Sequence, residues 1–322
     1  MKIKKFLSLL LTLALAVGLL PAALAADADA DREEMQALMN TIAASYVDNS
    51  GDWVVMDMAA YAALGLSDAQ TSDAARQDYI DSAIAAIQAE GAGDTVYAKA
   101  ILGLRAVGVD AAQLYSAGSE SAVSAVDGLN AAEQSASAWC APYTLAAYAQ
   151  GDWDTQAYES ALVEAVLAAQ LEDGSWSEWG DSIQTTSNMI VGLSFCRDAD
   201  ADVDAAIENA LNYLSAAQAE DGSYDAYGYG PDSNTAAMVV LALAAAGVNP
   251  DTDERFVKNG VSALDALLSF AYADHSGFGY QSGEPGEDAS SVAYATEQGF
   301  RALIAAWTVM TTGEACNVFD FS

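Results

Sequence analysis

The chain has 322 residues, of which 53% are hydrophobic, and its 46 acidic residues against 11 basic ones give a formal net charge of −35 at pH 7. Such a charge repels phosphate backbones and anionic headgroups and so excludes nucleic-acid binding, while the apolar content is too high for a disordered chain. One His and three Cys exclude a metal centre built on several imidazoles and a disulfide scaffold.

The first 25 residues have the composition of a secretory signal peptide. Lysines within 2–5 precede an apolar run over 6–20 and the small-residue pattern Ala23-Leu24-Ala25. This order predicts cleavage after Ala25. The alternative is an uncleaved membrane anchor, although about 15 apolar residues are short for a bilayer span of roughly 20. Three basic residues and no acids lie in 1–25, so the mature chain would carry a formal charge of −38. We expect a secreted, soluble protein without stable membrane insertion.

The mature chain, 26–322, is predicted to alternate charged amphipathic helices with drier ones. The charged helices are expected near 32–47, 73–89, 119–131, 155–170, 203–218 and 255–272, and the drier ones near 54–65, 95–107, 137–149, 184–196, 234–246 and 290–311. The helix at 234–246 has no charge at all and must be buried on every side. Six pairs of this kind predict one all-α domain of six helical hairpins.

Three loops between these helices resemble one another. They read QLEDGSW at 170–176, QAEDGSY at 218–224 and ADHSGFGY at 273–280, and their glycines lie about 48 and 55 residues apart. A fixed spacing of this length is typical of a repeat architecture. Periodicity alone does not separate a closed ring from an open solenoid; the dryness of the inner helices favours the ring.

The Gln-x-x-Asp-Gly-Ser-aromatic loop resembles the QW-type repeat of the terpenoid cyclase and protein prenyltransferase superfamily, which includes squalene cyclase-like proteins. The resemblance is clearest over 150–305 and implies a six-hairpin α/α toroid, a double-walled barrel of about twelve helices. The barrel is also similar to that of the cobalamin carriers, transcobalamin and intrinsic factor, so the fold by itself does not select a function. With the predicted signal peptide and the missing catalytic groups described next, we expect a non-catalytic, exported bacterial member of this superfamily.

The catalytic groups of the superfamily are missing at the matching positions. The segment 231–243 is similar to the cyclase segment with the Asp-x-Asp-Asp-Thr-Ala box, but Pro231, Ser233 and Asn234 stand where that box has its acids. Asp232 is one place out of register and is typical of a helix N-cap. The prenyltransferase zinc ligands are absent as well, since the single His275 has no Asp-x-Cys pair near it. We therefore predict no catalytic residue and no metal ligand.

Aromatic and polar side chains cluster in the loops that lead into the drier helices, and a toroid would gather these loops at one end. The predicted ligand-binding residues are Trp176, Trp179, Thr186, Asn188, Tyr224, Tyr227, Tyr229, Asp232, Asn234, Tyr280, Asp288 and Glu297. Trp176, Tyr224 and Phe278 share one repeat position, where a packing role is favoured. The aromatic residues beyond that position are the stronger candidates for binding.

These observations favour an exported, non-catalytic protein that binds a corrinoid, a glycan or another small molecule. No cofactor is predicted, and cobalamin would be a bound ligand. The cobalamin carriers close a second, β-rich domain over their ligand, and this chain has no room for one before Ser322, which weakens the corrinoid hypothesis.

One alternative is an isoprenoid cyclase or prenyltransferase-like enzyme that uses Asp57, Asp288 or Glu297. Another is a surface interaction module with a protein partner. The sequence does not decide whether Cys140 and Cys196 form a disulfide.

Overall fold

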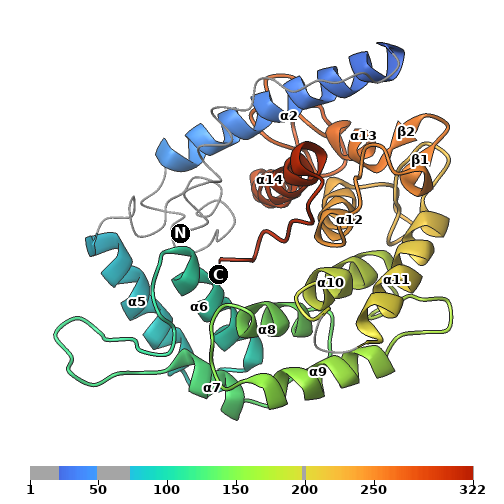
Figure 1. Ribbon diagram of the computed structural model, residues 1–322. Helices are drawn as coiled ribbons and strands as arrows, with labels where there is room; N and C mark the ends of the chain where they lie inside the picture. The colour runs from blue at the N-terminus through green and yellow to red at the C-terminus, as the bar shows by residue number, and fades with distance from the viewer. Residues whose placement is uncertain (1–21, 49–72, 198–200, 322) are drawn as a thin grey trace. The chain divides into compact units, whose positions relative to one another are not determined.

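The computed structural model describes residues 22–48, 73–197 and 201–321, and the chain is all-α in character (Figure 1). The predicted signal peptide falls almost entirely outside the described residues, as does the drier helix expected near 54–65. The described residues form two compact units, and the chain passes from one to the other within α11. Unit 1 comprises 22–48 and 215–316, and unit 2 comprises 73–214 and 317–321.

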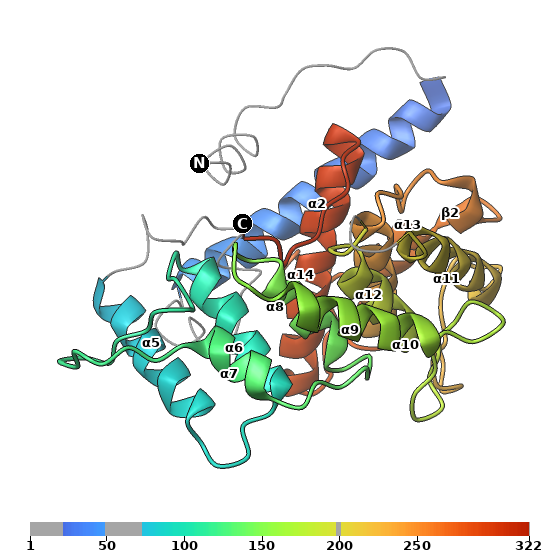
Figure 2. The ribbon, with the colours of Figure 1, turned by 60° about the horizontal axis from the view of Figure 1, so that its bottom comes forward.

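Unit 2 is built from consecutive helical hairpins. Its helices are α5 (Asp73–Ile87), α6 (Asp94–Ala106), α7 (Ala125–Ala131), α8 (Ala141–Tyr148), α9 (Gln156–Ala168), α10 (Ile183–Leu193) and most of α11 (Val203–Ala217). The helices α6, α8 and α10 pack side by side, and α5, α7 and α9 lie along one side of that row (Figures 1 and 2). The predicted alternation of helices therefore holds in this unit.

Burial follows the same alternation. In α10 every residue except Asn188 is buried, whereas α9 buries only Leu162, Val163 and Val166 along one stripe. Close packing in the inner row depends on small residues, since a Cβ added at Gly192 of α10 would lie 2.7 Å from the Cα of Pro142 in α8. The inner helices are dry because neighbouring helices cover them on more than one side.

Unit 1 is centred on the uncharged helix α12. Its elements are α2 (Ala22–Asp48), the end of α11, α12 (Ser233–Ala245), the 3-10 helix η1 (Glu254–Phe256), the antiparallel strands β1 (Val257–Lys258) and β2 (Val261–Ser262), α13 (Ala263–Leu268) and α14 (Ala289–Thr312). The helix α12 packs against both α13 and α14, and α2 packs against α14. Gly313 ends α14 in the left-handed conformation.

Three predicted helices are shorter than expected. The segment 255–272 contains a hairpin and only a short helix, because Asn259 and Gly260 both take positive φ and Ser262 with Asp265 forms a capping box that starts α13. The helix expected over 119–131 begins at Ala125, where Ser124 is the N-cap, and the one expected over 137–149 begins at Ala141. Caps and turns, rather than hydrophobic periodicity, set these boundaries.

The repeated loops have one hydrogen-bonding scheme. The side-chain amide of Gln170 donates to the carbonyls of Gly174 (2.9 Å) and Ala206 (2.8 Å), and that of Gln218 donates to Gly222 (3.0 Å) and Phe256 (3.0 Å). Each glutamine therefore closes its own loop and ties it to a later element of the chain, which is α11 for Gln170 and η1 for Gln218. The first two loops are also closed by backbone bonds, from the Leu171 N–H to the Ser175 carbonyl (2.8 Å) and from the Ala219 N–H to the Ser223 carbonyl (2.9 Å). The third loop has Ala271 in place of the glutamine and keeps only the backbone bond, from the Tyr272 N–H to the Gly277 carbonyl at 2.9 Å.

No helix within the described ranges has the length and apolar character that crossing a membrane requires. Cys140 and Cys196 form no disulfide, which answers the question left open by their spacing.

Candidate ligand-binding site

The aromatic residues at the shared repeat position are buried. The indole N–H of Trp176 donates to the Val166 carbonyl at 2.8 Å, and its backbone N–H donates to Thr186 Oγ1 at 3.0 Å. Phe278 repeats this bond with Thr296 Oγ1 at 3.0 Å, and Tyr224 is buried to the same degree. Trp176, Thr186 and Tyr224 thus hold their loops against the helices and present almost no surface to a ligand.

Trp179 has the opposite environment, with 89% of its surface exposed. It stands with Gly180 at the tip of a two-residue turn, where φ is +51° and +85°. Glu178 and Asp181 flank the turn and exchange two backbone hydrogen bonds of 3.0 Å. Positive φ at both central residues defines a type I′ hairpin turn, a position that normally takes Asn-Gly or Gly-Gly.

Both arms of this turn are anchored in unit 2. The Glu178 carboxylate accepts hydrogen bonds from the Ala138 N–H and the Ser137 hydroxyl, each at 2.8 Å. Asp181 is buried and accepts a bond from the Gln184 N–H at 3.1 Å at the start of α10. Burial raises the pKa of the Asp181 carboxyl despite these bonds. The tip is therefore held from two sides while Trp179 projects into solvent.

The corresponding loop of unit 1 displays two tyrosines. Tyr227 is 47% exposed and Tyr229 is 88% exposed. The Asp225 carboxylate organises the loop by accepting hydrogen bonds from the Gly228 N–H at 2.7 Å and the Gly230 N–H at 3.0 Å. Both glycines have positive φ, so the loop conformation is one that Gly adopts without strain.

The loops that begin at Trp176 and Tyr224 share a pattern of buried and exposed aromatic residues. In each, a buried aromatic residue is followed three positions later by an exposed aromatic residue and then by a glycine with positive φ: Trp176 with Trp179-Gly180 and Tyr224 with Tyr227-Gly228. The first residue fixes the loop and the second is displayed.

Three polar residues predicted for the site have structural roles, two of them at helix starts and one inside α14. The buried Asp232 caps α12 by accepting from the Thr235 N–H at 2.9 Å and the Thr235 hydroxyl at 2.8 Å, which confirms its interpretation as an N-cap, and burial raises its pKa. Asp288 caps α14 and is exposed; its hydrogen bonds from Ser290 lower its pKa. Glu297 pairs with Arg301 at 2.6 Å.

Three predicted residues are half-buried. Tyr280 accepts a bond from the Ser233 N–H at 2.9 Å through its carbonyl and donates its own N–H to the Glu287 carboxylate. Asn188 lies in the middle of α10, and Asn234 lies in the first turn of α12. The buried side-chain oxygen of Asn234 has no hydrogen-bond partner among the described residues. Of the predicted set, Trp176, Trp179, Thr186 and Asn188 belong to unit 2 and the others to unit 1.

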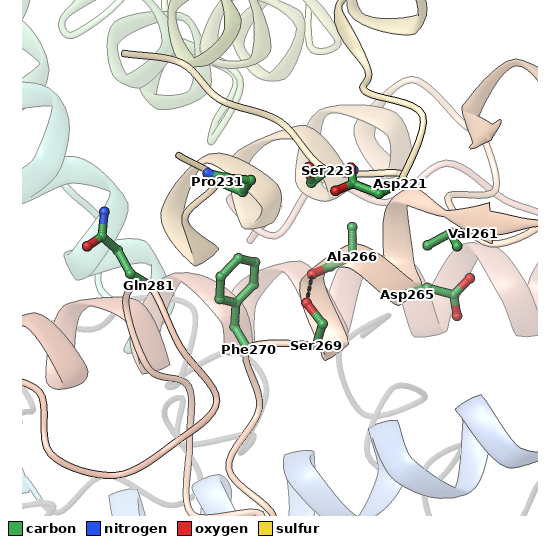
Figure 3. Close-up of a pocket in the computed structure, with 9 residues that line it drawn as sticks. All are labelled: Asp221, Ser223, Pro231, Val261, Asp265, Ala266, Ser269, Phe270 and Gln281. Carbon is green, nitrogen blue, oxygen red and sulfur yellow. Dashed lines mark hydrogen bonds between the residues drawn. The ribbon is translucent and has the colours of Figure 1, made fainter. Parts of the chain in front are cut away.

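A cavity of about 290 Å³ lies within unit 1, next to the loop that carries Tyr229 (Figure 3). Pro231, which ends that loop, lines it, and the Phe270 ring points toward Pro231 from the opposite wall. The full lining is Asp221, Ser223, Pro231, Val261, Asp265, Ala266, Ser269, Phe270 and Gln281. The volume is close to the lower end of the range of ligand pockets, roughly 300 to 1,000 Å³.

The polar groups of this cavity are carboxylates, hydroxyls and one amide, without a basic residue. Asp221 accepts a hydrogen bond from the Ser223 hydroxyl at 2.6 Å, and this bond lowers the pKa of the carboxyl. Asp265 accepts from the Ser262 N–H at 2.7 Å, and Ser269 donates to the Ala266 carbonyl at 2.7 Å. Such a lining suits a ligand that donates hydrogen bonds and disfavours an anion.

None of the residues predicted from sequence lines the cavity. Asp221 and Ser223 belong to the repeated loop, so the repeat could have pointed to them as site residues. The same repeat is explained equally well by the turn that these two residues stabilise. Phe270 and Gln281 are brought to the cavity by the turns that follow α13, which periodicity does not detect. Within the ranges that the structure describes, no group of three or more His, Cys, Asp or Glu side chains is arranged to hold a metal ion.

No protein-family model matches this chain, and no curated protein matches it.

Proposed function

We propose that this protein is an exported, non-catalytic binding protein for neutral glycans, which it takes up at the unit 1 cavity and the adjoining tyrosine loop. The observation that carries the proposal is the position of Tyr229. Its ring is almost fully exposed on a loop held by Asp225, and the same loop ends at Pro231 in the wall of a cavity lined by hydrogen-bond acceptors.

Neutral sugars match this combination of groups. The C–H face of a pyranose ring stacks on an aromatic ring, whose face carries partial negative charge, and the sugar hydroxyls donate to carboxylate and hydroxyl oxygens. Asp221, Asp265 and Gln281 offer such acceptors around the apolar surface of Phe270 and Pro231. A concave apolar surface with a few converging polar groups is the usual form of a small-ligand site.

The carboxylates of the cavity support binding rather than glycoside hydrolysis. A hydrolase needs one carboxyl whose pKa is raised so that it can donate a proton. The pKa of Asp221 is shifted in the opposite direction by its bonds from Ser223, and Asp265 is engaged by the Ser262 N–H in a capping box.

The proposal includes the closed α/α toroid and the export of the chain. The alternation of exposed and buried helices, the glutamine-closed loops and the resemblance to the QW-type repeat support a toroid. The lysines and apolar run of 1–25 support a signal peptide. Small-angle scattering tests the closed shape, and N-terminal sequencing of the secreted protein tests cleavage after Ala25.

Calorimetric titration with defined sugars tests the binding function. Cellohexaose, maltohexaose, mannohexaose and chitopentaose are the neutral probes, with polygalacturonate as an anionic comparator and aquocobalamin as a corrinoid comparator. We expect at least one neutral probe to bind, and polygalacturonate not to bind. Tyr229→Ser should weaken binding roughly tenfold, which corresponds to about 1.4 kcal/mol.

Tyr158→Ser is the matched control, because Tyr158 is an exposed tyrosine on α9 of unit 2. It should leave the affinity unchanged. The proposal fails if no neutral probe binds or if Tyr229→Ser and Tyr158→Ser behave alike. Tryptophan quenching by aquocobalamin without any response to sugars would instead establish the corrinoid alternative.

A further inference from the structure

We infer that Trp179 is a second glycan contact, a stacking platform on unit 2 that acts independently of the unit 1 cavity; the ligand class rests on the proposed function. Both the conformation of the turn and the exposure of the Trp179 ring support this role.

The turn holds a tryptophan in a conformation that a tryptophan disfavours. Non-glycine residues rarely adopt positive φ, and Asn is one of the few that do so readily. The same chain contains this turn a second time, between β1 and β2, where Asn259 and Gly260 have φ of +51° and +85°, the values of Trp179 and Gly180. Asn-Gly is therefore compatible with this turn in this protein. The turn conformation does not require a tryptophan, so another role must account for Trp179.

The turn that carries Trp179 is also preorganised by hydrogen bonds on both sides. The Glu178 carboxylate is fixed by Ser137 and Ala138, and Asp181 is fixed at the start of α10. Three residues before Trp179, Trp176 is buried and hydrogen-bonded at both its indole and its backbone. A side chain displayed from so constrained a backbone loses little entropy when it binds, which raises the affinity that a single ring can provide. Residues in disfavoured φ/ψ regions cluster at ligand contacts for this reason.

The chemistry around the ring selects a sugar. The chain neighbours Ser177, Glu178 and Gly180 supply no apolar side chain beside the ring, whereas the core of a protein interface is rich in apolar residues. Glu178 already accepts two hydrogen bonds. One aromatic face with polar surroundings is suited to the C–H face of a neutral sugar. Tyr227-Gly228 at the same repeat position of unit 1 shows that the display is repeated.

Oxidation by N-bromosuccinimide, followed by peptide mass mapping, reads Trp179 directly. Trp179 is the tryptophan with a largely exposed side chain among those described, and the half-buried Trp139, Trp153 and Trp307 serve as internal references. We expect at least one of cellohexaose, maltohexaose, mannohexaose and chitopentaose to slow oxidation of Trp179 about tenfold without changing the reference rates. The same protection should be seen in Phe270→Ala, which alters the unit 1 cavity.

Two variants of Trp179 separate binding from folding. Trp179→Asn places the favoured Asn-Gly pair in the turn, so it should keep the unfolding temperature or raise it while removing sugar binding by unit 2, measured calorimetrically in the Phe270→Ala background. Trp179→Tyr keeps an aromatic ring and should retain most of that binding.

If calorimetry detects binding at the cavity but Trp179 is oxidised at one rate with and without every probe, the inference is wrong and the proposed function stands. If the protection of Trp179 disappears in Phe270→Ala, Trp179 does not bind sugar independently of the unit 1 cavity, and the inference is overturned. Absence of both binding and protection removes the inference and the proposed function together. Protection that grows with protein concentration in the absence of sugar marks self-association through Trp179 and also overturns the inference.

Discussion

The side-chain amide of Gln150, at the end of α8, donates a 2.9 Å hydrogen bond to the carbonyl of Phe319 near the C-terminus. The amide oxygen of the same glutamine accepts a bond from the Phe321 N–H at 2.9 Å, and Gln150 itself is completely buried. One side chain therefore satisfies both a donor and an acceptor of the tail, which lies within unit 2.

Replacing Gln150 by Leu should lower the free energy of unfolding by about 2 to 4 kcal/mol, because it removes the hydrogen bonds that Gln150 makes to two buried backbone groups of the tail. Urea denaturation followed by circular dichroism measures the change. Gln113→Leu is the control, since Gln113 is exposed, and it should stay within about 0.5 kcal/mol of the parent. Equal effects of the two variants would mean that the tail does not depend on Gln150.

The glycines of the repeat provide a matched pair for separating backbone strain from steric overlap. Gly174 and Gly180 have nearly the same φ, +88° and +85°, but a Cβ at Gly174 would lie 2.4 Å from the Asn209 carbonyl oxygen, while a Cβ at Gly180 would meet nothing within 4 Å. Gly180→Ala should therefore cost about 1 to 2 kcal/mol from the left-handed conformation alone. Gly174→Ala should cost at least about 1 kcal/mol more. Thermal unfolding of both variants tests the order, and a smaller effect at Gly174 would contradict it.

Trp176 is expected to act through stability. Trp176→Phe removes the indole donor to Val166 and leaves a buried carbonyl without that partner, which should cost about 1 to 3 kcal/mol of unfolding free energy. Sugar affinity of the folded variant should change little, because Trp176 is buried. A stable Trp176→Phe variant that has lost sugar binding would show that the repeat position contacts the ligand.

Stability is expected to rise on mild acidification. Burial raises the pKa values of Asp181 and Asp232 in the folded state, so the folded state binds more protons than the unfolded state between the unfolded value, near 4, and the raised values. In that window the free energy of unfolding falls as pH rises. Reduced repulsion among the excess acids acts in the same direction.

Thermal unfolding between about pH 4 and pH 8 tests this prediction, with an expected maximum near pH 4 to 5. The exposed Asp173, Asp221 and Asp274 have lowered pKa values because of bonds from Ser175, Ser223 and Ser276, so their contributions are lost only below that range. Asp232→Asn should flatten the profile, whereas Asp173→Asn should not. A melting temperature that rises steadily toward pH 8 would contradict the assignment.

Sequence reasoning predicts the helices of this protein well where burial dictates the pattern. The uncharged stretch at 234–246 is α12, and the stripe of 203–218 is α11, because a 3.6-residue period records which face is covered. It predicts too much helix where local polar groups intervene, as at Asn259-Gly260 and Ser262, since a turn of two residues leaves no periodicity.

For the candidate site, the sequence alone determined that aromatic residues recur in loops of one design, that acids greatly outnumber bases, and that the Asp232 position is a helix cap. Only the tertiary structure decided which aromatic residues are displayed. Trp176 and Trp179 are equally apolar in the sequence, yet one is buried against Val166 and Thr186 and the other projects from a type I′ turn. The cavity beside Pro231 likewise depends on Phe270 and Gln281, which reach it from the segment that follows α13. Composition records the energetic preference of each residue type, but exposure depends on contacts between distant segments.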